Sequence, residues 1–524
     1  MENKKSITSN TTINSSLEAR VILLEHQLAE TQAKLNWYQE QHRLSQHIRF
    51  GSSSERTHPD QLILLFNEVE QTAKPLIPEP ELETLTLTRS KKSGKRKQQL
   101  DSLPVETVRY TLEETDKICN CCSGPLHLMS TEVRKELKVI PAQVKVVEHI
   151  RDVFGCRKCE REGTDTPIVT APMPVPAFPY SLASPSAVAH IMSQKYSEGM
   201  PLYRQEKQWA RFGIELSRQN MSNWVLYGVD RWLNHVYNRM HEYLLQSDII
   251  MADETPLQVL NEPDRPAQTN SYMWLYRTGR EGPPIVLFEY KPTRAGANPE
   301  SFLAGFRGYL QVDGYSGYNK VLATLVGCWA HAKRKFDVAL KKLPDSAQAS
   351  RNLAKEGLDF CNRLYQIDRK LKNSTAEERY ENRREECPPV MDAFLAWLEY
   401  NKNTVVPKSG TGEAITYCLN QWAKLNNYLK DGRLEIDNNR SERSIKPFVI
   451  GRKAWLFSNT PKGAEASAVV YSIVETAKEN KLNPFFYLTY LFEKLPNIDT
   501  NDKSGLDNLL PWSEAIPADC RVPK

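Results

Sequence analysis

Apolar residues near the N-terminus recur at alternating steps of four and three residues. The stripe consists of Leu17, Val21, Leu24, Leu28, Leu35 and Tyr38, with Thr31 interrupting it and His42 ending it. About three heptads of this kind predict a short coiled coil, and hence self-association. An amphipathic helix that packs on its own chain fits the same pattern equally well.

The next long apolar pattern, Ser186–Leu244, has helical periodicity with little Pro or Gly inside it. It follows the Pro-rich stretch Ala171–Pro185, which marks a boundary. Within it, Met200–Val225 predicts two helices joined at Phe212 and Gly213, and the second begins with the capped sequence SRQNMSNW. Both a DNA-binding helix-turn-helix and a packed helical hairpin fit this pattern.

After residue 248 the pattern changes to short extended runs. Three of them are rich in β-forming residues and separated by polar or Gly/Pro turns, which predicts a three-stranded meander. These runs are Ile249–Leu260, Ser271–Thr278 and Pro284–Tyr290. Tyr309–Val312 and Thr324–Trp329 predict two further strands, and the second runs into a helix. Taken alone, this pattern indicates an α/β domain.

Residues 338–430 interrupt the strands with a long helical and charged segment, in which Lys372–Cys387 has the composition of a solvated stretch. We interpret the segment as an all-helical insertion, and a boundary between two domains is the alternative. Beyond it, Gly463–Lys478 and Pro484–Leu495 predict two C-terminal helices. The residues after 500, rich in Asp, Asn and Pro, have the composition of a tail.

The segment LEIDNNRSERSIKPFVIGRKAWLF begins like a helix. Asp437 and Asn438 are suited to cap it, and Glu442 falls in its opening turns, where the positive helix end favours a carboxylate. Pro447 predicts that the helix ends at Lys446. One carboxylate among several basic side chains indicates a site for an anionic polymer and a metal, and a solvated, salt-bridged helix is the alternative. The basic residues are Arg440, Arg443, Lys446, Arg452 and Lys453.

The bulk composition is that of a soluble globular protein. Of 524 residues, 40% are hydrophobic and 25% are charged, and the net charge of +5 is small for this length. No apolar run approaches the ~18 residues of a membrane span, and the N-terminus lacks the apolar core of a signal peptide, so we expect a cytoplasmic location. Arg89–Lys97, RSKKSGKRK, is a local basic cluster that suits either an arm along nucleic-acid phosphates or a solvated tether.

Five of the ten cysteines lie close together in the sequence. Cys119 and Cys122 form one Cys-x-x-Cys knuckle, and Cys156 and Cys159 form a second. Two such knuckles predict a tetrahedral zinc site, because each short loop presents two thiolates to one ion. The alternating pattern of Lys138–Phe154 between the pairs predicts one or two strands, which suits a zinc ribbon. Reduced structural cysteines are the alternative.

Three acidic residues stand at predicted strands and at a predicted helix start. Asp253 lies in IIMADETPLQV, Asp313 ends YLQVD, and Glu442 opens the helix described above. Carboxylates that converge from distant segments can hold the two divalent ions that activate a nucleophile and stabilise the leaving oxygen in phosphoryl transfer. Asp313 alone also fits an ordinary Asp-Gly turn. Strand alternation puts Glu254 on the face opposite Asp253, so Glu254→Ala is expected to be mild.

Several motifs resemble a known family. FGSSSER, DQLILLFNEVE, ADETPLQVL, LQVDGYSGYNKV, CWAHAKRKFD and DNNRSER occur in the order and spacing of the IS66-type DDE transposases. GRKAWLFSNTPKGAEASAVVYSIVETAKEN extends the resemblance toward the C-terminus, so that it spans nearly the whole chain. The resemblance implies a ribonuclease-H-like catalytic core. It also implies that Asp253, Asp313 and Glu442 are the catalytic acids and the ligands of Mg²⁺ or Mn²⁺.

Pattern and resemblance together indicate a multidomain α/β protein. In the N-terminal half we expect a coiled-coil or helix-turn-helix-like region at 1–70, a Pro-rich basic linker at 71–104, a zinc-ribbon-like domain at 105–170 and a helical DNA-binding segment at 171–247. A ribonuclease-H-like catalytic domain is expected at 248–457, with a helical insertion at about 338–430. A helical C-terminal region at 458–500 and a tail at 501–524 would follow. The zinc ligands would be Cys119, Cys122, Cys156 and Cys159.

The function implied is that of an insertion-sequence transposase, which binds element ends and catalyses metal-dependent DNA cleavage and strand transfer. Candidate DNA contacts are His331, Arg334, Arg443, Lys446, Arg452 and Lys453. The expected partners are double-stranded DNA of the terminal repeats and the target, further copies of the chain, and small accessory proteins of the same element. A bacterial cytoplasmic protein, at the nucleoid when bound to DNA, would fit this role. The alternatives are a non-catalytic zinc-containing DNA-binding protein and a ribonuclease-H-like nuclease without strand transfer.

Overall fold

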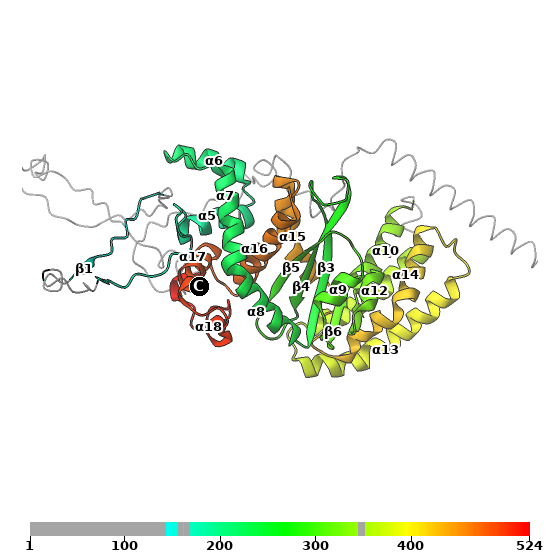
Figure 1. Ribbon diagram of the computed structural model, residues 1–524. Coiled ribbons are helices and arrows are strands. Elements are labelled where there is room, and N and C mark those ends of the chain that lie inside the picture. The colour runs from blue at the N-terminus through cyan, green and yellow to red at the C-terminus, as the bar shows by residue number, and fades with distance from the viewer. Residues whose placement is uncertain (1–142, 156–160, 162–167, 344–351, 524) are drawn as a thin grey trace, which may run out of the picture. The chain divides into compact units, whose positions relative to one another are not determined.

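The computed structural model describes residues 143–155, 161, 168–343 and 352–523 (Figure 1). The predicted coiled coil, the basic linker and the four cysteines of the zinc site lie outside these residues. All the helices and strands below belong to the compact unit that contains His149–Val522. A short antiparallel pair, β1 (Val153–Gly155) and β2 (Ile168–Thr170), stands on either side of Cys156 and Cys159 in the sequence.

A five-stranded mixed sheet forms the centre of this unit. Its strands are β3 (Ile249–Gln258), β4 (Asn270–Thr278), β5 (Val286–Lys291), β6 (Tyr309–Val312) and β7 (Thr324–Gly327). The order across the sheet is β5-β4-β3-β6-β7. The first three strands pair antiparallel, whereas β6 pairs parallel to β3 and β7 pairs parallel to β6. The predicted meander and the two later strands are therefore confirmed.

Helices before and after the sheet pack on it and on one another. They are α5 (Pro185–Tyr196), α6 (Leu202–Arg211), α7 (Arg218–Gly228), α8 (Asn234–Leu245), α16 (Pro461–Glu479) and α17 (Pro484–Lys494). The predicted break between α6 and α7 is present, because Gly213 has a φ of +81° that few other residues adopt. Ser217 caps α7, since its side chain accepts a hydrogen bond from the Asn220 backbone N–H at 3.2 Å.

The outer edge of β5 is closed by hydroxyl groups of α16. The backbone N–H of Phe288 donates to Ser472 Oγ at 2.7 Å, and that of Val286 donates to Thr476 Oγ1 at 3.0 Å. An exposed strand edge would otherwise offer unpaired N–H groups to another chain. The helix α16 is buried along nearly its whole length, which explains its run of Ala, Val and other small residues.

Four further helices build a second hydrophobic core beside β7. They are α10 (Trp329–Lys341), α12 (Leu353–Lys370), α13 (Ala376–Asn401) and α14 (Gly410–Asn426). They lie on the opposite side of the sheet from α5–α8 in Figure 1. Trp329, Phe336 and Phe394 are fully buried in this core. The helical character expected for residues 338–430 is confirmed for the part that the structure describes.

The charged stretch Lys372–Cys387 is mostly exposed or partly exposed, as expected, and most of it is helical. Helix α13 begins at Ala376 with a capping box between Thr375 and Glu378. Arg383 on this helix is only 1% exposed, and its guanidinium binds Asp368 of α12 and the carbonyl oxygen of Leu434. Arg383 thus ties α13 to α12, while Glu377, Glu381 and Arg384 on the same helix face solvent.

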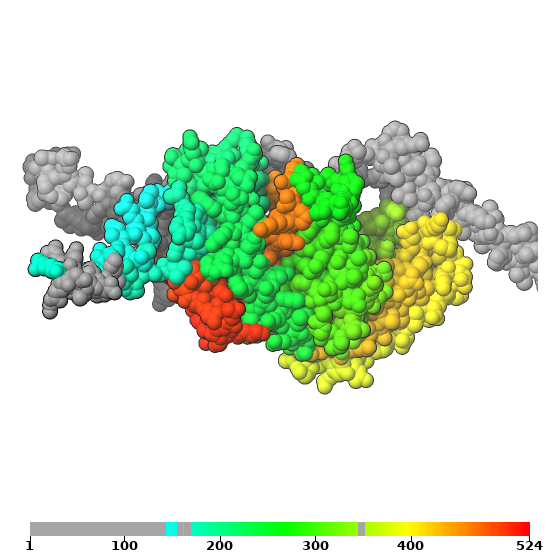
Figure 2. Space-filling model, in the orientation of Figure 1, coloured from blue at the N-terminus to red at the C-terminus, as the bar shows by residue number. Residues whose placement is uncertain are grey.

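The helix that carries Glu442 also differs from the sequence-based expectation. It is α15 (Asn439–Trp455), and it continues through Pro447 instead of ending at Lys446. A proline inside a helix removes one backbone hydrogen bond. Packing offsets this loss, because Phe448 is fully buried and its ring lies 5.3 Å from that of Tyr471 on α16. Part of the segment containing α15, coloured orange, reaches the surface on the face shown in Figure 2.

The C-terminal residues are not a detached tail. After α17 comes α18 (Lys503–Asp507), and Leu506, Leu510 and Ile516 are buried in the same core as the sheet. Arg239 on α8 forms an ion pair with Asp507 at 2.7 Å. The remaining short elements are η3 (Val229–Leu233), α9 (Ala297–Phe302), η4 (Ser316–Lys320), η5 (Asn427–Lys430), η6 (Leu495–Asn497) and η7 (Ala518–Cys520). No helix in the described part of the chain is both long and apolar enough to cross a membrane.

Candidate active site

One of the three predicted acids lies within a strand, and a second directly follows the neighbouring parallel strand. Asp253 is in β3, and Asp313 comes one residue after the end of β6. The register pairs Ile249 with Tyr309 and Met251 with Gln311, and extending it by two residues places Asp313 beside Asp253. Adjacent strands are ~4.8 Å apart, so this register brings the backbones of Asp253 and Asp313 close together. The Asp313 side chain also accepts the backbone N–H of Tyr315 at 2.8 Å, which shapes the turn after β6.

The third acid arrives on α15, whose start is tied to the same edge of the sheet. Asn438 Nδ2 donates to the carbonyl oxygen of Ala252 at 2.8 Å, one residue before Asp253. Asn438 therefore anchors the helix to β3. The sequence predicted that its side chain would cap the helix, but that side chain makes no capping hydrogen bond. The Asp437 side chain instead accepts the backbone N–H of Asn439 at 3.1 Å. Glu442 stands in the first turn, as predicted.

Asp253 is surrounded by other acidic side chains. Burial raises the pKa of Asp253 well above its usual range, and the carboxylates of Glu254, Asp313 and Glu442 raise it further. The backbone N–H of Glu254 donates to Asp253 Oδ1 at 2.9 Å and opposes this effect. A cluster of this kind favours a bound cation, because a cation relieves the repulsion among the carboxylates. Carboxylate oxygens are also the hard donors that Mg²⁺ and Mn²⁺ prefer, so these residues fit such ions.

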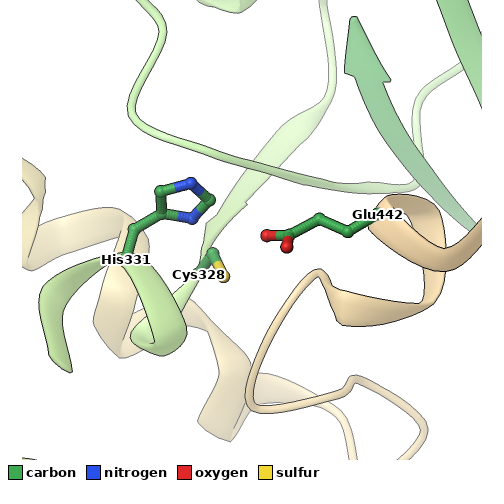
Figure 3. A group of neighbouring side chains, drawn as sticks. All are labelled: Cys328, His331 and Glu442. Carbon is green, nitrogen blue, oxygen red and sulfur yellow. The ribbon is translucent and has the colours of Figure 1, made fainter. Parts of the chain in front are cut away.

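His331 and Arg334 on α10 reach the same site. Arg334 forms an ion pair with Glu442 Oε2 at 3.4 Å. Burial lowers the pKa of His331, while Glu442 and Asp313 act in the opposite direction. Cys328, directly before α10, offers a third polarisable group, and its sulfur accepts the backbone N–H of Asn438 at 3.2 Å. Figure 3 shows Cys328, His331 and Glu442 facing one another.

Glu254 is part of a buried polar network that strand alternation did not indicate. Its carboxylate is 3% exposed, forms an ion pair with Arg294, and accepts a hydrogen bond from the Tyr318 hydroxyl at 2.5 Å. Burial raises the pKa of Glu254, and Asp313 raises it as well. Glu254 thus lies in a buried network next to Asp313, and the network connects β3 to the Asp313 loop.

The basic residues predicted around Glu442 divide into two groups. Arg440 pairs with Glu435 at 2.7 Å, and Arg452 contacts Thr255 and the carbonyl oxygen of Pro256, so both hold the fold together. Arg443, Lys446 and Lys453 are exposed on α15. Lys446 and Lys453 are spaced at four and eleven residues from Glu442, which places all three along one side of the helix.

Two cations near the acids were not predicted from the sequence. Arg294 interacts with both Glu254 and Asp313 and lies 3.9 Å from the centre of the Tyr315 ring. Lys424 on α14 donates to Asn319 at 2.7 Å; burial lowers its pKa, while Asp313 opposes that shift. Neither residue has a local sequence signal, because each reaches the site only through tertiary packing. Cys328 was also not predicted, although the sequence carries a signal for it, because it stands three residues before His331 in a Cys-x-x-His spacing.

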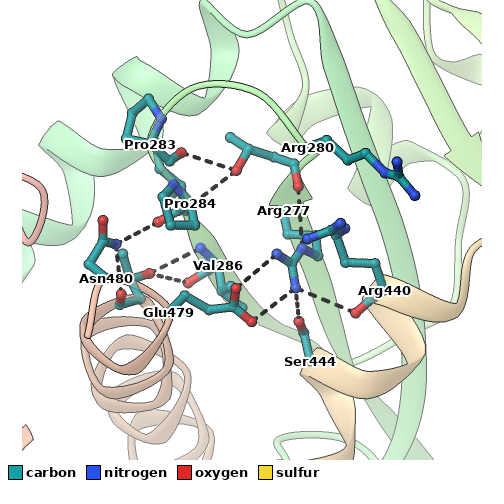
Figure 4. A network of polar contacts seen from close by, with 12 residues as sticks. Arg277, Arg280, Pro283, Pro284, Val286, Arg440, Ser444, Glu479 and Asn480 are labelled. Carbon is teal, nitrogen blue, oxygen red and sulfur yellow. Dashed lines mark hydrogen bonds and ion pairs between the residues drawn. The ribbon is translucent and has the colours of Figure 1, made fainter. Parts of the chain in front are cut away.

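A buried arginine fixes α15 against the sheet. Arg277 on β4 is 1% exposed, and its guanidinium donates to Ser444 Oγ, to the Arg440 carbonyl oxygen at 3.4 Å and to Glu479 on α16 at 3.3 Å (Figure 4). Ser444 is two residues from Glu442, on the buried side of the helix. One side chain therefore links β4, α15 and α16, and sets the position from which Glu442 projects.

Four family models match successive parts of the chain, and all four describe transposases. The family model described as transposase IS66 family matches residues 180–466. The zinc-finger binding domain of transposase IS66 matches 116–160, the IS66 C-terminal element matches 472–512, and the model named Transposase C of IS166 homeodomain matches 37–108. The chain belongs to the IS66 family of transposases. The zinc-finger match spans all four predicted zinc ligands and supports a zinc-binding region there.

Relatives of similar length are known from Sinorhizobium fredii (strain NBRC 101917 / NGR234). Uncharacterized protein y4jD is 33% identical over 429 residues, which cover 78% of this chain and 81% of the relative. Uncharacterized protein y4hP is 29% identical over 429 residues, which cover 78% and 75% respectively. The similarity therefore extends well beyond the motifs around the acids.

Proposed function

We propose that this protein is a transposase that cuts DNA at the ends of its element and joins those ends to target DNA by divalent-metal-dependent phosphoryl transfer. Asp253, Asp313 and Glu442 would be its catalytic acids and the ligands of Mg²⁺ or Mn²⁺. The observation that carries this proposal is the placement of Asp253 on β3, of Asp313 directly after the parallel-paired β6, and of Glu442 on α15, whose start is tied to β3 by Asn438. Metal-assisted transfer needs such a cluster.

The topology supports a ribonuclease-H-like core. Three antiparallel strands are followed by two parallel strands on the far side of β3, with α10 after the last strand. The chain between α10 and α15 forms the helical insertion, and Tyr365 on its α12 donates to Asp437 at 3.0 Å. The insertion therefore contacts the start of the helix that carries Glu442. This organisation supports the catalytic domain proposed for residues 248–457.

The residues around the acids have separate tasks in this proposal. Bound divalent ions would activate the attacking hydroxyl and stabilise the charge on the leaving oxygen. Arg334 and Lys424 face the carboxylates from α10 and α14, where they would hold phosphate oxygens of the DNA. His331 is kept neutral by burial, so it is suited to exchange a proton or accept a hydrogen bond close to Glu442.

The proposed DNA contacts extend beyond the acids. The exposed Arg443, Lys446 and Lys453 on α15 would bind phosphates beside the scissile bond. The zinc-finger region, the basic segment Arg89–Lys97 and the capped helix α7 would provide additional DNA contacts. Double-stranded DNA, other copies of the chain and small accessory proteins are the proposed partners. Phosphate contacts of this kind weaken steeply as salt concentration rises.

Strand cleavage and joining on a DNA fragment with the element's ends would test the proposal. We expect Asp253→Asn, Asp313→Asn and Glu442→Gln each to lose both reactions in Mg²⁺ and in Mn²⁺ while retaining binding to the DNA ends. Asp337→Asn is the matched control, because Asp337 lies on α10 in a surface ion pair with Lys341. Cleavage that survives in Asp313→Asn would contradict the proposed triad. Cleavage without joining by the wild type would instead indicate a nuclease that only hydrolyses.

A further inference from the structure

Three different donor atoms meet beside the proposed acid cluster. The ligand atoms of Cys328, His331 and Glu442 all lie within 4.8 Å of one another. Figure 3 shows the imidazole, the thiol and the carboxylate turned toward a common point, with Cys328 and His331 at the start of α10 and Glu442 on α15. Two segments separated by about a hundred residues thus supply the group.

Two of these groups have buried atoms without a hydrogen-bond partner. His331 Nδ1 and Glu442 Oε1 are inaccessible to solvent and unpaired among the described residues. Buried polar atoms are rarely left unpaired, so an unpaired pair that faces a common point suggests a missing ligand. The third donor, Cys328 Sγ, belongs to a residue that is 1% exposed, and it accepts the Asn438 N–H at 3.2 Å. Burial raises the pKa of the Cys328 thiol to about 12, so an ion that binds here displaces the thiol proton.

The donor set indicates which ion fits. A thiolate, an imidazole and a carboxylate form a mixed site that favours Zn²⁺ over Mg²⁺, because hard Mg²⁺ prefers oxygen ligands only. Three protein donors leave the fourth position of a tetrahedron open. Arg334 competes for the site, since its guanidinium lies 3.4 Å from Glu442 Oε2, but Oε1 stays available.

We propose that Cys328, His331 and Glu442 bind one Zn²⁺-class ion, at a site separate from the zinc finger. Glu442 belongs to this site and to the proposed catalytic triad, so an ion held here withdraws Glu442 from the Mg²⁺ site. Zinc is therefore an inhibitor of strand cleavage that competes for one shared glutamate. This second consequence rests on the proposed function, whereas binding of the ion does not.

Zinc content of the full-length protein tests the site directly. Elemental analysis after dialysis against a low micromolar zinc buffer should find one equivalent fewer in Cys328→Ser than in the wild type. Cys418→Ser is the matched control, because Cys418 is equally buried but lies in the core of the helical insertion. Cys156→Ser should lose the zinc ion of the finger instead. The double variant Cys156→Ser with Cys328→Ser should therefore bind two zinc ions fewer than the wild type.

His331→Ala provides a second variant that leaves the thiol in place, should Cys328→Ser fold poorly. With Co²⁺ in place of zinc, the sulfur-to-metal absorption should fall in Cys328→Ser and shift in His331→Ala, and should stay unchanged in Cys418→Ser. Equal zinc content in the wild type, Cys328→Ser and His331→Ala would overturn the proposal.

Activity separates the two claims. Cleavage in Mg²⁺ is measured at increasing zinc concentrations, and each protein is compared with its own zinc-free rate. The zinc concentration that halves the rate should be at least tenfold lower for the wild type than for Cys328→Ser. Zinc content that depends on Cys328 without any such difference would overturn the inhibitory role alone. If Asp253→Asn cleaves normally, the proposed function fails, and the zinc measurement still decides whether the metal site exists.

Discussion

At the scale of single residues, Glu254 is the side chain whose role the structure changes most. It was expected to point away from the acids, yet its carboxylate joins Arg294 and Tyr318 in a buried network. Arg294 also packs on the ring of Tyr315, which follows Asp313 in the same loop. Glu254 therefore acts as a positioning residue, which holds the Asp313 loop against β3.

We expect Glu254→Ala to unfold more easily than the wild type by about 2–3 kcal/mol, because it removes charge-assisted hydrogen bonds in a buried site. Cleavage should fall with it, through displacement of Asp313. Glu254→Gln keeps the contact with Tyr318 and should recover most of the stability. Thermal unfolding and the cleavage rate, measured together, would check this. A fully active and stable Glu254→Ala variant would restore the sequence-based expectation.

Asp253, Asp313 and Glu442 could be predicted as candidate acids because each lies in a family motif. The strands and the helix that carry them could be predicted from the periodicity of apolar residues. Arg294 and Lys424 escaped prediction for a physical reason. Their neighbours in the chain carry no pattern, and only the packing of a loop and of α14 brings them to Asp313. Long-range electrostatic partners of this kind are set by tertiary structure.

At the scale of elements, α15 has to be held in place because it projects Glu442. Arg277 is a buried side chain that holds α15 in this position.

Arg277→Met should lower the free energy of unfolding by about 2–3 kcal/mol, because the hydrogen bonds to Ser444, Arg440 and Glu479 are lost together. Arg277→Lys should rescue part of the cleavage rate. Arg280→Met is the control, since the Arg280 side chain is one-third exposed and pairs with Glu435, a carboxylate that Arg440 also holds. Equal effects of the two Met variants would refute the positioning role.

The edge strand β5 contains a pH-dependent element. Burial raises the pKa of Glu289 to about 7, although Lys291 opposes the shift. The folded state thus holds this proton more tightly than the unfolded chain, so its stabilising contribution is present below pH ~4.5 and is lost as pH rises through about 7. Between pH 5 and 8 the wild type should lose up to about 3 kcal/mol relative to Glu289→Gln. Denaturation of both proteins at several pH values measures this difference, and parallel curves would contradict it.

Elements also show where local patterns mislead. Pro447 signals a helix end, yet α15 continues through it. Burial of the neighbouring Phe448 outweighs the local preference of the proline. Propensity describes the isolated segment, whereas this helix is stabilised by the core that it helps to build.

At the scale of the whole molecule, transposition requires two element ends to be handled together, which fits a self-associating protein. The heptad stripe is the sequence's candidate for this role, and it lies outside the described residues. Deleting residues 1–48 should lower the number of chains per particle, measured by sedimentation, while the zinc content per chain stays constant. If the number of chains per particle is unchanged, the stripe serves only for packing within one chain.

The central claim is that Asp253, Asp313 and Glu442 form one metal site. The most direct measurement is an anomalous-diffraction map from crystals of the protein bound to DNA ends in Mn²⁺. The account predicts an Mn²⁺ peak within about 2.0–2.6 Å of carboxylate oxygens from both Asp253 and Asp313, with Glu442 completing the site. The peak should disappear in Asp313→Asn. Mn²⁺ bound elsewhere in the complex, with Asp253 and Asp313 free of metal, would contradict the account.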